Sequence, residues 1–102
     1  MSRQAELTVI YWRDIPAQVT ATGGGRSARV ALGDRFQEAI DAAAMEAGLT
    51  DSDAYLEEWR QEKRPCGDDL ERETAAEADR LGEAFPPDVL DALVRAGGRL
   101  LA

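Results

Sequence analysis

Residues 8–19, TVIYWRDIPAQV, constrain the fold of this chain most, because they hold its densest cluster of aromatic and β-branched side chains. Such residues favour extended structure. Large apolar side chains fall on both faces of the segment from Leu7 to Trp12, so we expect a strand whose two faces are both at least partly covered. Coverage on both faces is typical of a central strand, and we predict one here.

The residues after this strand predict a hairpin. Pro16 lacks an amide hydrogen and biases the residue before it toward extended geometry, so the strand breaks at a polar corner formed by Arg13 and Asp14. Residues 17–32 then alternate in side-chain character around a run of three glycines at 23–25. Because glycine adopts positive φ angles readily, we expect two strands closed by a glycine loop.

The rest of the chain changes to helical spacing. Asp34 can cap a first helix, and Gly48 is a natural stop for it. We expect a second helix from a capping box at Thr50 to about Lys63, and a third over about residues 68–84. The pair Pro86-Pro87 starts a last helix, which Gly97-Gly98 ends.

These elements predict an α+β fold. The first third of the chain forms a small antiparallel sheet of about three strands, and about four helices cover it. The length of 102 residues fits a single domain, 1–102, with one modest core.

The charge of the chain is uneven. Acidic residues outnumber basic ones by 20 to 12, and residues 1–33 carry a net charge of +2 while the remainder carries −10. A strongly acidic helical part repels phosphates, which argues against nucleic acid as a partner. The absence of histidine removes the usual general base near neutral pH and the commonest metal ligand, and we predict neither a metal nor a cofactor.

Cysteine content and the first residues bear on the compartment. Cys66 is the only cysteine, so no disulfide within the chain is possible, which fits a reducing cytoplasm. The first residues lack the apolar run of a signal peptide, and no segment approaches the length of a membrane span. We therefore expect a cytoplasmic protein that does not bind membranes.

The corner Trp12-Arg13-Asp14 is the first candidate site. An indole can anchor a partner, and a guanidinium can bind a carboxylate or phosphate through two parallel hydrogen bonds. The alternative is structural: Trp12 fills the core between sheet and helices, while Arg13 and Asp14 satisfy backbone groups of the turn. The two interpretations differ in whether replacing Arg13 weakens partner binding or folding.

Tyr55 and Trp59 form the second candidate binding pair. On the expected helix they lie one turn apart and so must be neighbours. They can form half of an aromatic anchor for another protein, or they can simply belong to the core.

Three further motifs give weaker indications of function. The glycine run is followed by a strand and lacks the lysine and hydroxyl of a Walker loop, so we interpret it as a hairpin tip. Cys66 follows Arg64-Pro65 and precedes a helix start, a setting that can lower a thiol pKa, but no histidine or second cysteine is present to assist it. The acidic residues at 68–73 do not have the spacing of a calcium loop.

The words TVIYWRDIPAQV, RVAL, DRFQEAIDAAAMEAGL and DAYLEEWR, in this order and spacing, resemble the small bacterial proteins called virulence factor domain proteins. The resemblance covers about residues 7–64, which leaves 65–102 as a helical C-terminal extension. The same domain is part of proteins related to conserved virulence factor C, where it accompanies an iron–sulfur-scaffold-type domain and helical repeats. This chain resembles the stand-alone form. The family implies no catalytic residue, but it implies a link to folate and corrinoid one-carbon metabolism.

Three functions remain open. The chain can be a non-catalytic interaction or accessory subunit that docks on a larger cytosolic protein, which its lack of paired acids, bases and nucleophiles favours. It can instead be an accessory component of one-carbon metabolism, with a methyltransferase or corrinoid protein as partner, as the resemblance implies. The third alternative is a small enzyme that uses Arg13, Asp14 and Cys66.

Overall fold

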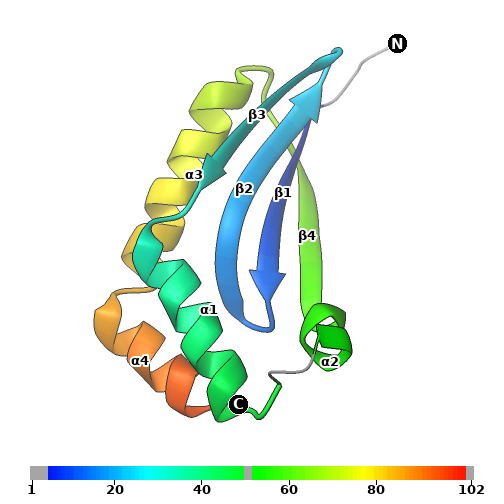
Figure 1. The fold of residues 1–102 in the computed structure, drawn as a ribbon. Coiled ribbons are helices and arrows are strands. Elements are labelled where there is room, and N and C mark those ends of the chain that lie inside the picture. The colour runs from blue at the N-terminus through cyan, green and yellow to red at the C-terminus, as the bar shows by residue number, and fades with distance from the viewer. Residues whose placement is uncertain (1–4, 50–51, 101–102) are drawn as a thin grey trace.

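The computed structural model describes residues 5–49 and 52–100 and has the predicted α+β architecture, with an antiparallel sheet and helices packed against it (Figure 1). The sheet has four strands where about three were expected, in the order β3-β2-β1-β4. The elements in this part of the chain are the strands β1 Ala5–Trp12, β2 Ile15–Gly23, β3 Arg26–Ala31 and β4 Trp59–Cys66, and the helices α1 Asp34–Glu46, α2 Ser52–Glu57, α3 Leu70–Ala84 and α4 Pro87–Arg95.

The first strand is central, as its two apolar faces predict. β1 pairs with β2 on one side and with β4 on the other, both antiparallel. The expected hairpin forms β2 and β3, and its turn contains Gly24 and Gly25 at φ angles of 58° and 78°. These angles are strained for residues with a side chain, which explains the glycine run.

β4 was not predicted. The expected second helix ends at Glu57, and the chain from Trp59 onward is a strand that pairs with β1 along its whole length. Residues 60–64 are good helix formers, but they offer no large apolar side chain that would hold a helix to the core, whereas pairing with β1 satisfies the backbone. Four charged residues and Pro65 suit an edge strand, because they discourage pairing with other chains.

The helix ends follow the sequence closely, with small differences. α1 begins at Asp34, but Gly33 is the N-cap residue and no side chain caps the helix, so Asp34 lies in the first turn instead. Gly48, at a φ of 73°, follows the end of α1, and Gly97 and Gly98 follow α4. The capping box expected at Thr50 lies outside the described residues.

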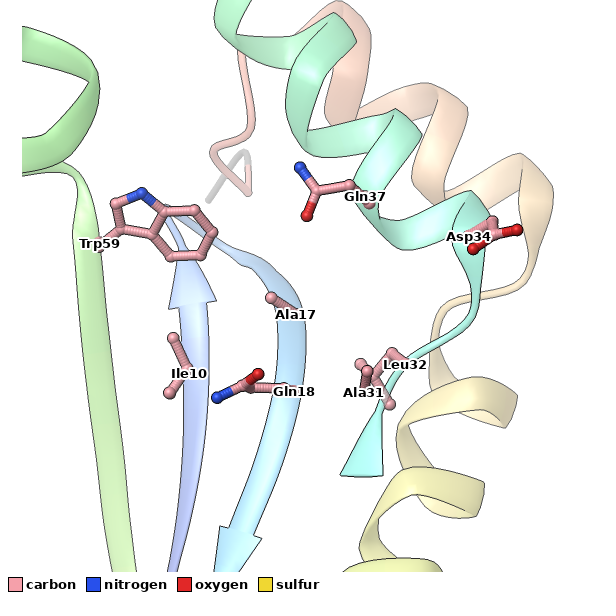
Figure 2. A pocket seen from close by; sticks show the side chains of 8 residues that line it. All are labelled: Ile10, Ala17, Gln18, Ala31, Leu32, Asp34, Gln37 and Trp59. Carbon is pink, nitrogen blue, oxygen red and sulfur yellow. The ribbon is translucent and has the colours of Figure 1, made fainter. Parts of the chain in front are cut away.

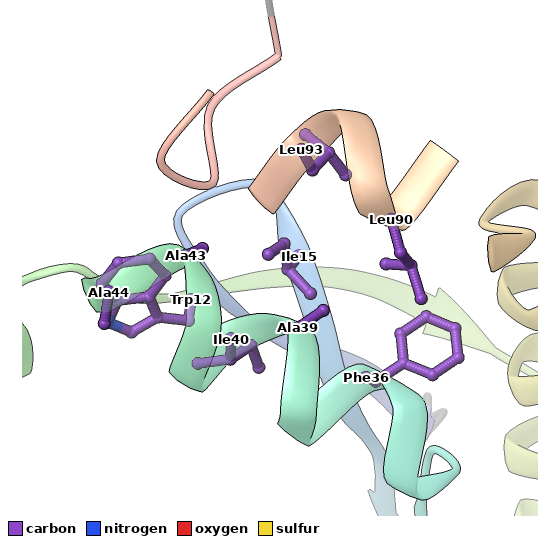
Figure 3. Close-up of a cluster of buried hydrophobic side chains, with 9 residues drawn as sticks. All are labelled: Trp12, Ile15, Phe36, Ala39, Ile40, Ala43, Ala44, Leu90 and Leu93. Carbon is purple, nitrogen blue, oxygen red and sulfur yellow. The ribbon is translucent and has the colours of Figure 1, made fainter. Parts of the chain in front are cut away.

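The core lies mainly on one face and at one end of the sheet. α3 packs against β2 and β3 over a face that carries Leu7, Val9 and Val19. α1 and α4 pack together at the end where β1 turns into β2 (Figure 1). Figure 3 shows the cluster buried there, which consists of Trp12, Ile15, Phe36, Ala39, Ile40, Ala43, Ala44, Leu90 and Leu93.

Candidate functional site

A cleft of about 430 Å³ lies between α1 and the sheet face opposite α3 (Figure 2). Ile10 of β1 and Gln18 of β2 lie on the sheet side, Trp59 of β4 stands at one end, and Gln37 of α1 faces them from the other side. The remaining lining is small or apolar apart from one carboxylate: Ala17, Ala31, Leu32 and Asp34. The cleft therefore combines an aromatic wall, two amide side chains and a single charge.

The sheet face around this cleft lacks charge at its centre. Thr8, Ile10, Gln18 and Thr20 alternate with the residues that face α3, and all four are partly exposed. Charged groups appear only toward the edges, for example Lys63, whose Nζ lies 3.9 Å from a carboxylate oxygen of Glu6. In a chain with 31% charged residues, such a centre resembles the core of a protein interface, which is depleted in charge and contains aromatic side chains.

Trp59 and Tyr55 are neighbours, but not on one helix. Their rings meet edge to face with centroids 6.0 Å apart across the junction of α2 and β4. Tyr55 also stacks on Trp12, with ring centroids 5.5 Å apart. Burial raises the pKa of Tyr55, so its hydroxyl stays protonated at neutral pH. The structure thus places Trp59 in the lining of the cleft, with Tyr55 packed against its ring.

Trp12 is fully enclosed, with 0% of its surface exposed. Its indole N–H donates a hydrogen bond to the carbonyl oxygen of Tyr55 at 3.0 Å. The buried polar atom is therefore satisfied, and the ring fills the core beneath α1, as the structural interpretation of the corner requires. Trp12 offers no surface to a partner in this conformation.

Arg13 lies at the turn between β1 and β2 with a φ of 54°, an uncommon value for a residue with a side chain. Its Nε lies 3.2 Å from a carboxylate oxygen of Glu58, and its Nη1 donates to the carbonyl oxygen of Gly97 at 2.9 Å. The guanidinium also lies over the ring of Trp12, 5.2 Å from its centroid. Only 13% of the side chain is exposed, because these contacts surround it.

Asp14 joins the same corner to two other segments. One carboxylate oxygen lies 3.2 Å from Nη2 of Arg60, and the other accepts a hydrogen bond from the backbone N–H of Leu100 at 2.6 Å. Arg60 in turn donates to the carbonyl oxygen of Arg13 at 2.8 Å. The corner therefore fastens the segment that carries Trp59, and the C-terminal loop, to the end of β1.

Cys66 is remote from this corner. In the pairing of β1 with β4 it lies opposite Ala5, whereas Trp59 lies opposite Trp12. Seven residues of strand separate the two positions by roughly 23 Å, so Arg13, Asp14 and Cys66 do not form one site. Burial, and secondarily the carboxylate of Glu73, raises the pKa of Cys66, and the neighbouring Arg64 does not reverse this shift. This direction is opposite to the lowering that Arg64 and the following helix start could produce.

Sequence reasoning missed most of the cleft. Ile10, Gln18 and Gln37 are ordinary residues whose chemistry signals nothing, and they become neighbours only through the strand pairing and the position of α1. Trp59, which the sequence predicts on a helix, is the one lining residue that the sequence marks as a candidate. Among the described residues, no group of three or more cysteine or acidic side chains is placed to hold a metal ion. No helix in that part of the chain has both the length and the apolar character needed to cross a membrane.

The comparison with known proteins identifies the family alone. A family model described as virulence factor matches residues 10–94. The match runs from the end of β1 into α4, and so includes the cleft and the corner. No curated protein and no solved structure matches the chain. The chain belongs to the virulence factor family.

Proposed function

We propose that this chain is a non-catalytic interaction module, which docks on a larger protein through the sheet face around Trp59. The observation that carries the proposal is the cleft itself. It has an aromatic wall, amide groups that can donate and accept hydrogen bonds, and Asp34 as its one charged lining residue, and the centre of the sheet face around it carries no charge. Aromatic anchors at a charge-depleted centre are the usual hot spots of protein interfaces.

The corner supports this face indirectly. Trp12, Arg13 and Asp14 bond to Tyr55, Glu58 and Arg60, which flank Trp59 in the chain. We infer that the corner holds Trp59 at the wall of the cleft, and that a partner contacts Trp59 and the outer side of Tyr55. In this account the five residues suggested by the sequence have two roles: three position the surface and two belong to it.

Affinity capture of the tagged protein from its own host tests the proposal. We expect a stoichiometric partner with the unaltered chain, and its loss with Trp59→Ala or with Gln18→Arg, which places a charge at the centre of the face. Leu56→Ala is the matched control, since Leu56 is 59% exposed on α2 and does not line the cleft. Thermal unfolding of each variant separates loss of binding from loss of folding.

The result also separates the functional alternatives. If Leu56→Ala and the cleft variants release the partner equally, the cleft is not the docking surface. A methyltransferase or corrinoid protein as partner would point to the accessory role in one-carbon metabolism. Turnover of a substrate by the purified chain alone would contradict the proposal.

A further inference from the structure

A second hollow, of about 280 Å³, lies on the sheet face that α3 covers. Leu7, Val9 and Tyr11 of β1 contribute to it, and α3 borders it through Glu77 and Arg80. The residues of β4 that complete the lining are Glu62, Lys63 and Arg64. This hollow is therefore on the other side of the sheet from the cleft at Trp59, and its lining has a different chemistry.

Glu77 is the unusual residue here, because it is only 4% exposed and yet carries a carboxylate. Arg64 Nη2 donates to its Oε1 at 3.0 Å, and Arg80 Nε donates to the same oxygen at 3.0 Å. Arg80 Nη2 bonds to the other oxygen, Oε2. These hydrogen bonds, from Arg80 above all, lower the pKa of Glu77, so it is ionised at neutral pH. One carboxylate thus fixes two guanidiniums that come from different elements.

The arrangement leaves positive charge in the hollow. Two guanidiniums share one carboxylate, and the side chains of Arg64 and Arg80 remain 52% and 62% exposed. Each guanidinium has five N–H donors, of which Glu77 engages one from Arg64 and two from Arg80. Glu62, the other carboxylate in the lining, is bonded to Arg60, which also pairs with Asp14, whereas no ion pair joins Glu62 to Arg64 or Arg80 among the described residues.

Tyr11 adds a neutral donor beside the arginines. Burial, followed by the carboxylate of Glu62, raises its pKa, so its hydroxyl keeps its proton at neutral pH and can donate a hydrogen bond. Leu7 and Val9 next to it are almost fully buried. An apolar floor strengthens hydrogen bonds and charge interactions above it, because it excludes water on one side.

Two of the other hollows in the described part of the chain differ in charge. Asp34 is the only charged group of the cleft at Trp59. A groove between α1 and α4 contains Glu38 and Asp91 against a single arginine, Arg35. In a chain with a net charge of −8, the hollow at Tyr11 is notable because two arginines line it, whereas the ammonium group of the third cationic residue, Lys63, lies 3.9 Å from Glu6.

We propose that this hollow binds an oxyanion, the phosphate or carboxylate group of a small ligand, through Arg64 and Arg80. Arginine guanidiniums suit this role because their planar donors match both groups. Tyr11 supplies a further hydrogen bond, and Glu77 is a positioning residue that aligns the two arginines. The site is independent of the docking face, since the two lie on opposite sides of the sheet.

Titration with inorganic phosphate tests the site on the whole chain. The ionic strength is kept constant with sodium chloride, and binding is followed by NMR at the backbone amides and at the Nε–H groups of the arginines. We expect saturable shifts at Arg80 and along residues 62–64, with affinity falling about tenfold or more in Arg80→Gln, because this variant loses a charged hydrogen-bond donor. Arg72→Gln is the control, because Arg72 is exposed on the same helix and does not line the hollow.

Two outcomes would overturn the proposal: shifts that never saturate, or equal affinities in Arg80→Gln and Arg72→Gln. Glu77→Gln tests the positioning role, because it removes a negative charge and makes the hollow more positive. We expect weaker phosphate binding in this variant, and stronger binding would show that Glu77 does not act by alignment. Capture experiments with Arg80→Gln distinguish the source of the anion: an unchanged yield of partner indicates a free ligand, and a lost partner indicates an acidic group on that protein.

Discussion

Replacing Arg13 by alanine distinguishes a structural corner from a recognition corner. The charged hydrogen bond to the carbonyl oxygen of Gly97 contributes about 1.5–3 kcal/mol. The ion pair with Glu58 adds up to about 1 kcal/mol. The contact with the ring of Trp12 adds about 0.5–1 kcal/mol. Because neighbouring contacts do not add fully, we expect Arg13→Ala to lower the free energy of unfolding by about 2–4 kcal/mol.

A second substitution at the same position sharpens this test. The φ of 54° at Arg13 is unfavourable for any residue with a Cβ by roughly 1 kcal/mol, and glycine avoids that penalty. We therefore expect Arg13→Gly to be more stable than Arg13→Ala by up to about 1 kcal/mol, although glycine is normally the less stabilising of the two. This order follows only if the turn keeps its conformation.

Urea denaturation followed by far-ultraviolet circular dichroism measures both variants. Thermal unfolding gives a second measure, because a loss of about 3 kcal/mol corresponds to a drop in Tm of roughly 12–24 °C for a domain of this size. A loss below about 0.5 kcal/mol for Arg13→Ala, the usual range for an uninvolved surface residue, would refute the structural role. A glycine variant less stable than the alanine variant would refute the turn geometry.

Three further predictions concern stability and reactivity. Gly98→Ala should destabilise the fold more than Gly24→Ala. Both glycines have positive φ, but a Cβ at Gly98 would lie 2.9 Å from the ring of Trp12, whereas one at Gly24 would meet nothing within 4 Å. Equal losses of stability in thermal unfolding would contradict this prediction. Because the pKa of Glu77 is lowered in the folded chain, its ion pairs stabilise the fold fully above the ordinary glutamate pKa of about 4.3, and this stabilisation is lost as the pH falls below that value. Glu77→Gln should therefore weaken the fall in the free energy of unfolding at acid pH. An unchanged fall would count against the ion pairs. Cys66, with its raised pKa, should react with iodoacetamide more slowly than free cysteine at pH 7.5, and faster alkylation would show an activated thiol.

The first third of the fold was predictable because local chemistry decides it. The β-branched run of β1, the break before Pro16 and the glycine turn all act over a few residues. β4 was not predictable in the same way, since residues 60–64 favour a helix locally and become a strand only by pairing with β1, about fifty residues earlier in the chain. Long-range pairing leaves little trace in a single sequence.

The candidate site likewise has one part that the sequence predicts and another that only the structure shows. Trp12-Arg13-Asp14 was recognisable from the sequence as a special corner, but burial and contacts, not residue type, decide between anchoring a partner and anchoring the chain. The cleft depends on β4 and on the approach of α1, so its floor at Ile10 and Gln18 could not be found without the structure. In the sequence Glu77 is one of several acidic residues of α3, and only its burial in the structure distinguishes it.

Site-specific photo-crosslinking in the native host tests the docking face most directly. A photoreactive amino acid replaces Gln18 at the floor of the cleft in one version of the protein, and replaces Glu83, exposed on α3, in the other. We expect one discrete partner protein to crosslink to the version with the probe at position 18 and not to the version with the probe at position 83. A partner that crosslinks only from position 83, or equally from both, would contradict it.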